Sequence, residues 1–388
     1  MASVGPETSN PGADEAERRF RGFHSAFALL RLQWSKQLRN LIASGTNACS
    51  APINKIGVFA MTAITLEEHF LSHHLTDYQA ANGHDAFTKK LPHAQVDVMS
   101  EVGPKRIASM DAGGVRVQVI SHGPGEADLP TCQKINNDLA GHCKDSPARL
   151  AGFAMLPMST PVEAAQELER CVKHLKFVGA LIDNHLDDGT FYDAQRFWPV
   201  FARAEELDVP IYIHPSPAAA DWMPQYGQGV LKEPAPMVLS IAGWGWHATT
   251  ALHFLRLWCS GLFDAHPRLK IILGHMGEML PYQIERTAKA APRMAPHVKR
   301  DLMTVFRDNV WITTSGMFTM PPFKCLWDVA RHDHIMYSVD YPFSTNETGR
   351  QFLEHLRSSG LLSAAEYEAF EHGNAEKLLR LQPSPSSQ

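Results

Sequence analysis

The sequence predicts an α/β fold, a (β/α)8 barrel of the TIM type, and three observations lead to this prediction. From Ala63 onward, short runs rich in β-branched residues alternate with longer stretches of helical periodicity. Such alternation is typical of parallel strands joined by helices, and eight units along residues 63–388 suit a closed barrel. No Gly-x-Gly-x-x-Gly motif follows the first strand, which argues against an open dinucleotide-binding sheet.

Each expected strand is a short apolar run that ends at a turn or at polar residues. Between the strands, Pro161–Leu175 and Asp193–Leu207 have the three- and four-residue spacing of amphipathic helices. In chain order, we expect the eight strands at Ala63–Glu67, Val115–Ser121, Leu150–Leu156, Val178–Asp183, Val209–His214, Lys270–Gly274, Val310–Thr314 and Ile335–Val339.

Two segments depart from this repeating pattern. Residues 1–60 are an N-terminal extension to the barrel of residues 61–388, and they combine a Gly-, Pro- and Ser-rich start with a basic amphipathic helix. Three explanations stay open: a targeting segment, a helix packed on the barrel or a partner subunit, and a dispensable extension before a translation start at Met61. Residues 215–269, between the fifth and sixth strands, are an insertion that we expect to form a lid or an oligomer contact.

The composition excludes several classes of protein. The 388 residues include 36 basic and 41 acidic side chains, a balance of −5 that argues against a general nucleic-acid binder. No apolar run approaches the roughly 18 residues of a membrane span. The six cysteines form no Cys-x-x-Cys pair and no secretory signal is visible, so we expect free thiols in the cytoplasm. The twenty histidines, by contrast, prompt a search for a metal site.

Polar residues gather at the carboxyl ends of the expected strands, where barrels of this kind carry their chemistry. Because side chains alternate along a strand, Glu67 and His69 point the same way at the end of the first strand, while Glu68 points away. Two carboxylates and several imidazoles in one cavity suit a divalent ion and leave coordination positions for a substrate. The residues that converge on the barrel mouth are Glu67, His69, His214, His275 and Asp340.

Each of these residues taken alone has a simpler interpretation. A single histidine at a strand end is usually just hydrogen-bonded, Glu67 can be a surface turn carboxylate, and Asp340 can initiate a turn. Their joint occurrence at the ends of the first, fifth, sixth and eighth strands favours the metal site. His247 and His253, within the insertion, are interpreted as core residues or as part of a pocket wall.

Four segments resemble the metal-dependent decarboxylases of the amidohydrolase superfamily: Leu66–Phe70, His214-Pro215, Gly274–Glu278 and Asp340–Pro342. The resemblance covers about residues 61–380 and is to the branch that includes γ-resorcylate and 2,3-dihydroxybenzoate decarboxylases. It implies an amidohydrolase-like barrel, a carbon–carbon lyase of the carboxy-lyase type, a small aromatic acid as substrate and a homo-dimer or homo-tetramer.

The same resemblance implies roles for individual residues. One divalent metal ion is expected, Zn²⁺ ahead of Mn²⁺ or Mg²⁺, with the ligands Glu67, His69, His214 and Asp340. His275 and Glu278 would form an acid–base pair. Arg286 would contact the substrate, with a solvated helix arginine as the alternative. Separately from the resemblance, we expect Phe343 to wall the substrate ring, with an ordinary core aromatic as the alternative. The chain departs from hydrolytic relatives in starting with Glu-x-His instead of His-x-His, and no lysine ends the fourth strand to support a two-metal site.

The chemistry of such a reaction can be argued separately from the resemblance. Direct loss of CO₂ from an aryl carboxylate leaves an unstable carbanion, whereas an ortho hydroxyl allows the ring carbon to be protonated first. A metal holding the carboxylate and the phenolate would orient the substrate and spread charge. We expect Asp340 to donate the proton to carbon, and His275, polarised by Glu278, to accept the phenolic proton or hold the phenolate.

Two alternatives to this function are kept. One is a metal-dependent hydrolase of lactones or amides on the same scaffold, in which Asp340 would serve as the base for a metal-activated water. The other is a non-catalytic barrel used as a binding or scaffold protein. The Glu-x-His start and the Gly274–Glu278 segment argue against the hydrolase, and the complete set of acid–base residues argues against the scaffold.

Overall fold

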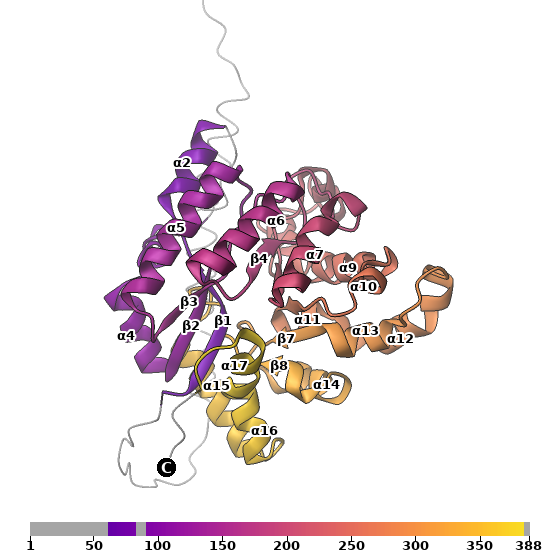
Figure 1. Ribbon diagram of the computed structural model, residues 1–388. Helices are drawn as coiled ribbons and strands as arrows, with labels where there is room; N and C mark the ends of the chain where they lie inside the picture. The colour runs from indigo at the N-terminus through magenta and orange to yellow at the C-terminus, as the bar shows by residue number, and fades with distance from the viewer. Residues whose placement is uncertain (1–60, 83–90, 384–388) are drawn as a thin grey trace, which may run out of the picture.

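The computed structural model describes residues 61–82 and 91–383, and these fold into parallel strands surrounded by helices (Figure 1). All eight predicted strands are present, with bounds that shift by a few residues. The third and eighth are shorter than expected, because pairing there continues only as isolated bridges. The strands are β1 (Ala63–Phe70), β2 (Val115–His122), β3 (Leu150–Gly152), β4 (Ala180–Asp183), β5 (Ile211–His214), β6 (Ile271–Leu273), β7 (Val310–Thr313) and β8 (Ile335–Met336).

The strands pair in sequence order and the two ends of the row meet. Continuous parallel pairing forms two rows of neighbouring strands, one from β1 through β3 and one from β4 through β8. A parallel bridge between Ala154 and Ala180 connects the two groups on one side, and a parallel bridge between Glu68 and Tyr341 connects them on the other. The predicted (β/α)8 barrel is therefore confirmed. The division of the chain at residue 60 stays a prediction, because residues 1–60 lie outside the described part.

Helices cover the outside of the barrel, and several begin with a proline that fits the first helical turn. The predicted segment Pro161–Leu175 is helical throughout, as α6 and the π-helical turn η2. Before β5 the helices are α2 (His73–Ala81), α3 (His93–Ser100), α4 (Pro104–Gly113), α5 (Leu129–Asp145), α6 (Pro161–Arg170), η2 (Cys171–Leu175), η3 (Gln195–Phe197) and α7 (Trp198–Leu207). After β6 they are α11 (His275–Glu278), α12 (Leu280–Met294), α13 (Leu302–Asn309), α14 (Met320–Val329), η5 (His332–His334), α15 (Asn346–Ser359), α16 (Ala364–Glu368), η6 (Ala369–Gly373) and α17 (Asn374–Leu379).

The insertion between β5 and β6 is built from helices. It contains η4 (Ala220–Tyr226), α8 (Ala235–Ser240), α9 (Gly245–Cys259) and α10 (Leu262–Ala265). Its helix α9 is fixed to the end of β4, because the Asn184 side chain donates hydrogen bonds to the hydroxyls of Thr249 and Thr250 at 3.1 and 3.0 Å. Among the described residues, no helix is both long and apolar enough to cross a bilayer.

The barrel interior is a small apolar layer that is closed at its base. Alternate residues of the strands fill it, and α17 packs Ala375, Leu378 and Leu379 against the same layer. The interior is therefore sealed at the amino ends of the strands, which leaves the carboxyl ends as the accessible mouth. The strand residues of this layer are Ile64, Leu66, Val117, Val119, Phe153, Leu181, Tyr212, Ile272 and Met336.

A β-bulge in β1 sets the direction of the side chains at its end. Between Thr65 and Glu68, β1 has one residue more than the paired stretch of β2. Leu66 therefore belongs to the interior layer, and Glu67 follows it inward. The two neighbouring N–H groups of Leu66 and Glu67 both donate to the Ser338 hydroxyl, at 3.0 and 2.8 Å. Ser338 thus satisfies the backbone donors that the bulge removes from the ladder.

Glu68 closes the seam between the first strand and the segment after β8. Its carboxyl accepts from the Ser338 hydroxyl and from the backbone N–H groups of Val339 and Tyr341, at 3.0–3.2 Å. The Gln118 amide donates to the same carboxyl at 3.2 Å. Burial raises the pKa of Glu68 to about 8, even though these backbone donors favour the ionised form. These contacts show that the Glu68 side chain points away from Glu67 and His69, as predicted.

We expect Glu68→Ala to lower the free energy of unfolding by about 3 kcal/mol, because it leaves the buried N–H groups of Val339 and Tyr341 without acceptors. Urea denaturation followed by circular dichroism would measure the change. Glu368→Ala, at an exposed glutamate of α16, is the control and should change stability by about 0.5 kcal/mol or less. Equal stability of the two variants would contradict a role for Glu68 in closing the seam.

Candidate metal centre and acid–base site

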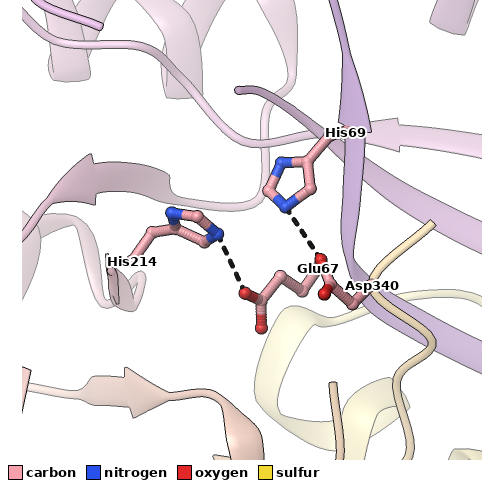
Figure 2. Close-up of side chains that lie close together, drawn as sticks. All are labelled: Glu67, His69, His214 and Asp340. Atoms are coloured by element: carbon pink, nitrogen blue, oxygen red, sulfur yellow. Dashed lines mark ion pairs between the residues drawn. The ribbon is translucent and has the colours of Figure 1, made fainter. Parts of the chain in front are cut away.

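Four of the predicted residues meet at the mouth of the barrel (Figure 2). Glu67 and His69 come from the end of β1, His214 from the end of β5, and Asp340 from the segment after β8. Each offers one ligand atom, and these atoms all lie within 4.8 Å of one another. The structure therefore brings together side chains that are separated by up to 273 positions in the sequence (340 minus 67).

Two close pairs organise this cluster. His214 Nε2 lies 3.0 Å from Glu67 Oε1, and His69 Nε2 lies 3.3 Å from Asp340 Oδ1, as the dashed lines in Figure 2 show. Glu67 and His69 are fully buried, whereas the Asp340 side chain keeps 16% of its surface exposed. Asp340 is therefore the member of the cluster that faces an incoming molecule.

The buried polar atoms of the cluster fit a cation. Glu67 Oε1 and His69 Nε2 are buried without a well-aligned hydrogen bond, and His214 Nε2 lies 3.0 Å from the same Glu67 oxygen. Unsatisfied buried polar atoms are costly, and two of them that face one cluster need a common partner. A divalent ion is such a partner for this mixture of carboxylate oxygens and imidazole nitrogens. The residues present therefore fit one metal ion.

The charge states of the cluster suit metal binding as well. Burial would raise the pKa of Glu67, but the histidines His275, His214 and His69 outweigh it, so this pKa is lowered and the carboxylate is ionised. Burial lowers the pKa of His69, which keeps its imidazole neutral. The pKa of His214 is raised, because the attraction of Glu67 exceeds the effect of burial. A cation bound beside Glu67 would replace the proton that His214 holds there.

Tyr212 orients Glu67 and was not among the predicted site residues. Its hydroxyl hydrogen-bonds to Glu67 Oε2, and it also lies 2.7 Å from the Thr313 hydroxyl and 3.0 Å from the Ser315 hydroxyl. Holding Oε2 in this way leaves Oε1 directed at the cluster. The signal in the sequence is alternation: Tyr212 stands two residues before His214 on β5 and so shares its face.

His275 and Glu278 form the predicted pair beside the cluster. His275 Nδ1 lies 2.7 Å from Glu278 Oε1, while His275 Nε2 lies 3.8 Å from Asp340 Oδ2 and 3.9 Å from Glu67 Oε1. Burial would raise the pKa of Glu278, but His275 and His247 together lower it. The imidazole of His275 therefore connects an ionised buried carboxylate to the edge of the cluster.

The chain reaches this geometry through a short turn after β6. At Gly274 a side chain is excluded, since a Cβ would lie 2.5 Å from Glu67 Oε2 and 2.9 Å from the Tyr212 hydroxyl oxygen. The next five residues, His275 to Met279, all have positive φ angles between 46° and 85°. Such backbone is unfavourable for residues with a Cβ, so the contacts of His275 and Glu278 must hold it in place.

Of the three predicted substrate-binding residues, His275 lies beside the cluster, and the structure separates the other two. The Phe343 ring lies edge-on to His69 with a centroid distance of 5.6 Å, and its side chain is 37% exposed, so it stands at the rim of the cluster. Arg286 is exposed on α12 and is not brought into the cluster. Its contact with a substrate stays a prediction.

His247 is a further member of the site, and its functional interpretation was left open by the sequence. It comes from α9 of the insertion, and its Nδ1 lies 2.7 Å from Glu278 Oε2. His253, on the same helix, is instead a buried core residue whose Nε2 accepts from the backbone N–H of Tyr192 at 3.2 Å. Sequence spacing carries no signal for the His247 contact, because it depends on how the insertion folds back.

A buried set of carboxylates and imidazoles at the mouth of a (β/α)8 barrel defines the class of metal-dependent barrel enzymes. A model of the amidohydrolase family matches residues 72–381. The chain belongs to this family.

Relatives within the family include decarboxylases. The decarboxylase orsB of Emericella nidulans is 43% identical over 291 residues, which cover 74% of this chain and 87% of the relative. The gamma-resorcylate decarboxylase of Polaromonas sp. is 34% identical, with 82% of this chain and 98% of the relative covered. A crystal structure of dihydroxybenzoic acid decarboxylase from Polaromonas sp., with bound manganese and the inhibitor 2-nitroresorcinol, is 31% identical with a TM-score of 0.71, covering 82% of this chain and 97% of that one.

We expect the purified protein to bind one divalent ion per chain, and His214→Asn to weaken this binding by about 10-fold or more, because it removes a buried imidazole ligand. Elemental analysis after dialysis against graded chelator would measure it. His266→Asn is the control: this histidine is also paired with a carboxylate, Glu205, but it is more exposed and precedes β6 at the closed end of the barrel. Equal metal retention in both variants would exclude His214 as a ligand.

Proposed function

We propose that the protein is a metal-dependent carboxy-lyase that removes CO₂ without oxidation from an ortho-hydroxybenzoate, giving the phenol. The observation that carries this proposal is the juxtaposition of the Glu67–His69–His214–Asp340 cluster with a separate His275–Glu278 pair. A hydrolase needs one acid or base to activate water. This site offers a proton donor, Asp340, and in addition the imidazole of His275 for a phenol. The decarboxylase names of its relatives support the same reaction.

Protonation before carbon–carbon cleavage makes this reaction feasible. Asp340, the exposed member of the cluster, donates a proton to the ring carbon that carries the carboxylate. The carbon–carbon bond then breaks, its electron pair restores the aromatic ring, and CO₂ leaves. The reaction consumes one proton, so the Asp340 carboxylate takes up another from solvent before the next turnover.

The remaining residues hold the substrate and its charge. A divalent ion held by Glu67, His69, His214 and Asp340 would supply a positive charge that stabilises the carboxylate and the ionised phenol. His275 Nε2, within 4 Å of both carboxylates, is placed to accept the proton of the phenol or to hold the phenolate, and Glu278 fixes its ring. Phe343 at the rim would contact the face of the aromatic ring.

The substrate class and the metal are part of this proposal. Similarity to gamma-resorcylate decarboxylases favours a 2,6-dihydroxybenzoate pattern, with 2,3-dihydroxybenzoate, orsellinate and salicylate-like acids as the other members of the class. The sequence favours Zn²⁺, and the manganese of the related Polaromonas structure supports Mn²⁺ at the same kind of site. The predicted homo-oligomer and the cytoplasmic location stay predictions.

A CO₂-release assay on a panel of benzoates tests the proposal. The panel would contain 2,3- and 2,6-dihydroxybenzoate, orsellinate and 6-methylsalicylate, with benzoate and 4-hydroxybenzoate as controls. We expect release only from the acids with an ortho hydroxyl, loss of release after chelation, and recovery with Zn²⁺ or Mn²⁺, because the metal and the phenol must act together. Silence across the panel from protein with bound metal would favour the lactone or amide hydrolase instead.

Asp340→Asn tests the assigned proton donor. We expect kcat to fall by about 10²- to 10⁴-fold, the range lost with a general acid. Metal content must be measured in parallel, since Asp340 is also a candidate ligand. Asp301→Asn is the matched control, because Asp301 caps α13 and Asn caps a helix equally well. Turnover at the wild-type rate in Asp340→Asn would remove this residue from the mechanism.

A further inference from the structure

A continuous chain of three side chains links the insertion to the metal cluster. His247, in the first turn of α9, places Nδ1 2.7 Å from Glu278 Oε2. Glu278 in turn places Oε1 2.7 Å from Nδ1 of His275, whose Nε2 faces Asp340. The rings of His247 and His275 also meet edge to face, with centroids 4.9 Å apart. One buried carboxylate is therefore shared between a histidine of the insertion and a histidine of the barrel.

The two oxygens of Glu278 determine which ring nitrogens of His247 and His275 donate hydrogen bonds. Glu278 is fully buried, and each of its oxygens is paired with one imidazole, so neither oxygen is left without a donor. An ionised carboxylate only accepts, so both imidazoles must donate from Nδ1. His247 Nε2 faces another acceptor, the carbonyl oxygen of Ala242 at 3.3 Å. The His247 ring thus lies between two acceptors, the Glu278 carboxylate and the Ala242 carbonyl oxygen.

Without His247, Glu278 would keep a buried oxygen with no donor. The carboxylate would then be free to rotate away from His275 or to take up a proton. Either change would release the imidazole whose Nε2 faces Asp340 and Glu67. His275 also sits on the run of positive φ angles after Gly274, which makes its orientation depend on side-chain contacts.

His247 reaches Glu278 only when α9 lies across the barrel mouth. The same helix turn is fixed on its other side by the hydrogen bonds from Asn184 at the end of β4 to Thr249 and Thr250. The first turn of α9 therefore joins the end of β4 to the turn after β6, on either side of the strand that carries His214. Movement of the insertion would break the contact with Glu278.

We propose that His247 is a positioning residue that fixes His275 through Glu278, and so makes catalysis depend on the seating of the β5–β6 insertion. The proposal rests on the proposed function, which gives His275 its role at the substrate phenol. His247 does not touch the cluster of Glu67, His69, His214 and Asp340, so its effect is on orientation and not on metal binding.

The three groups have an alternative use as a second metal site. Their potential ligand atoms lie within 4.8 Å of one another. The two N–O distances of 2.7 Å are those of hydrogen bonds, and both oxygens of Glu278 have a hydrogen-bond partner, whereas Oε1 of Glu67 has no well-aligned one. The observed geometry therefore favours hydrogen bonding, and metal analysis distinguishes the two uses.

The test compares two substitutions at one position in the full-length, metal-loaded protein. His247→Leu removes the donor to Glu278, whereas the amide nitrogen of His247→Asn can occupy the place of Nδ1 and keep it. With 2,6-dihydroxybenzoate, we expect His247→Leu to lower kcat by about 10- to 100-fold, with KM changed by about 3-fold or less. His247→Asn should recover kcat to within about 5-fold of the wild type. His266→Asn, paired with Glu205 at the other end of β6, should leave both constants unchanged.

Hydrogen exchange measured by mass spectrometry gives a readout that needs no turnover. We expect His247→Leu to increase amide exchange in both the first turn of α9 and the segment His275–Met279, and His247→Asn and His266→Asn to change neither. If exchange is faster in both segments of His247→Leu but the wild type releases no CO₂, the coupling is supported and the proposed function is rejected. Unchanged kcat and unchanged exchange in His247→Leu would overturn the inference. Two ions per wild-type chain, reduced to one in His247→Leu, would overturn it in favour of a second metal site.

Discussion

The hydrogen bonds around Ser338 are the constraint on which the rest of the site depends. One hydroxyl accepts the two N–H groups exposed by the bulge of β1 and donates to Glu68, which in turn accepts from the backbone after β8. This seam closes the barrel and directs Glu67 inward. It also fixes the backbone on both sides of Asp340, since the Tyr341 carbonyl accepts from the N–H of His69 at 2.7 Å. The ligands from the first strand and the last are thus placed by one network.

The site assigns different environments to chemically similar groups. Glu68 is buried in a structural seam that raises its pKa, whereas its neighbour Glu67 is buried among histidines that lower its pKa. His69 is kept neutral by burial, while His275 is held against the ionised Glu278. Two adjacent glutamates can therefore serve the barrel and the candidate metal site separately, because neighbouring side chains on a strand point in opposite directions and the bulge turns Glu67 inward.

Much of the fold and of the cluster could be predicted from the sequence, for physical reasons that differ between residues. Strand periodicity located all eight strands, and their carboxyl ends identified Glu67, His69, His214 and Asp340. The bulge was not predictable, because simple alternation from Ile64 and Leu66 would have pointed Glu68 inward instead of Glu67. Tyr212 could have been found by alternation from His214, but the contact of His247 depends on tertiary folding of the insertion. The substrate contact of Arg286 stays a prediction, since spacing from His275 along a helix does not fix which side the residue faces.

The seam between the first and last strands also has a consequence for the order of folding. The hydrogen bonds from Leu66 and Glu67 to Ser338 span 272 and 271 positions, so nearly the whole barrel must be synthesised before they can form. Contacts of such long range carry the largest loop-closure entropy and are expected late in folding. Since Asp340 lies within this seam, a nascent chain lacks the complete candidate ligand set until its last strand has docked. If the cluster holds a metal ion as proposed, loading is a property of the finished barrel, and partly folded chains would offer only an incomplete site to competing metals.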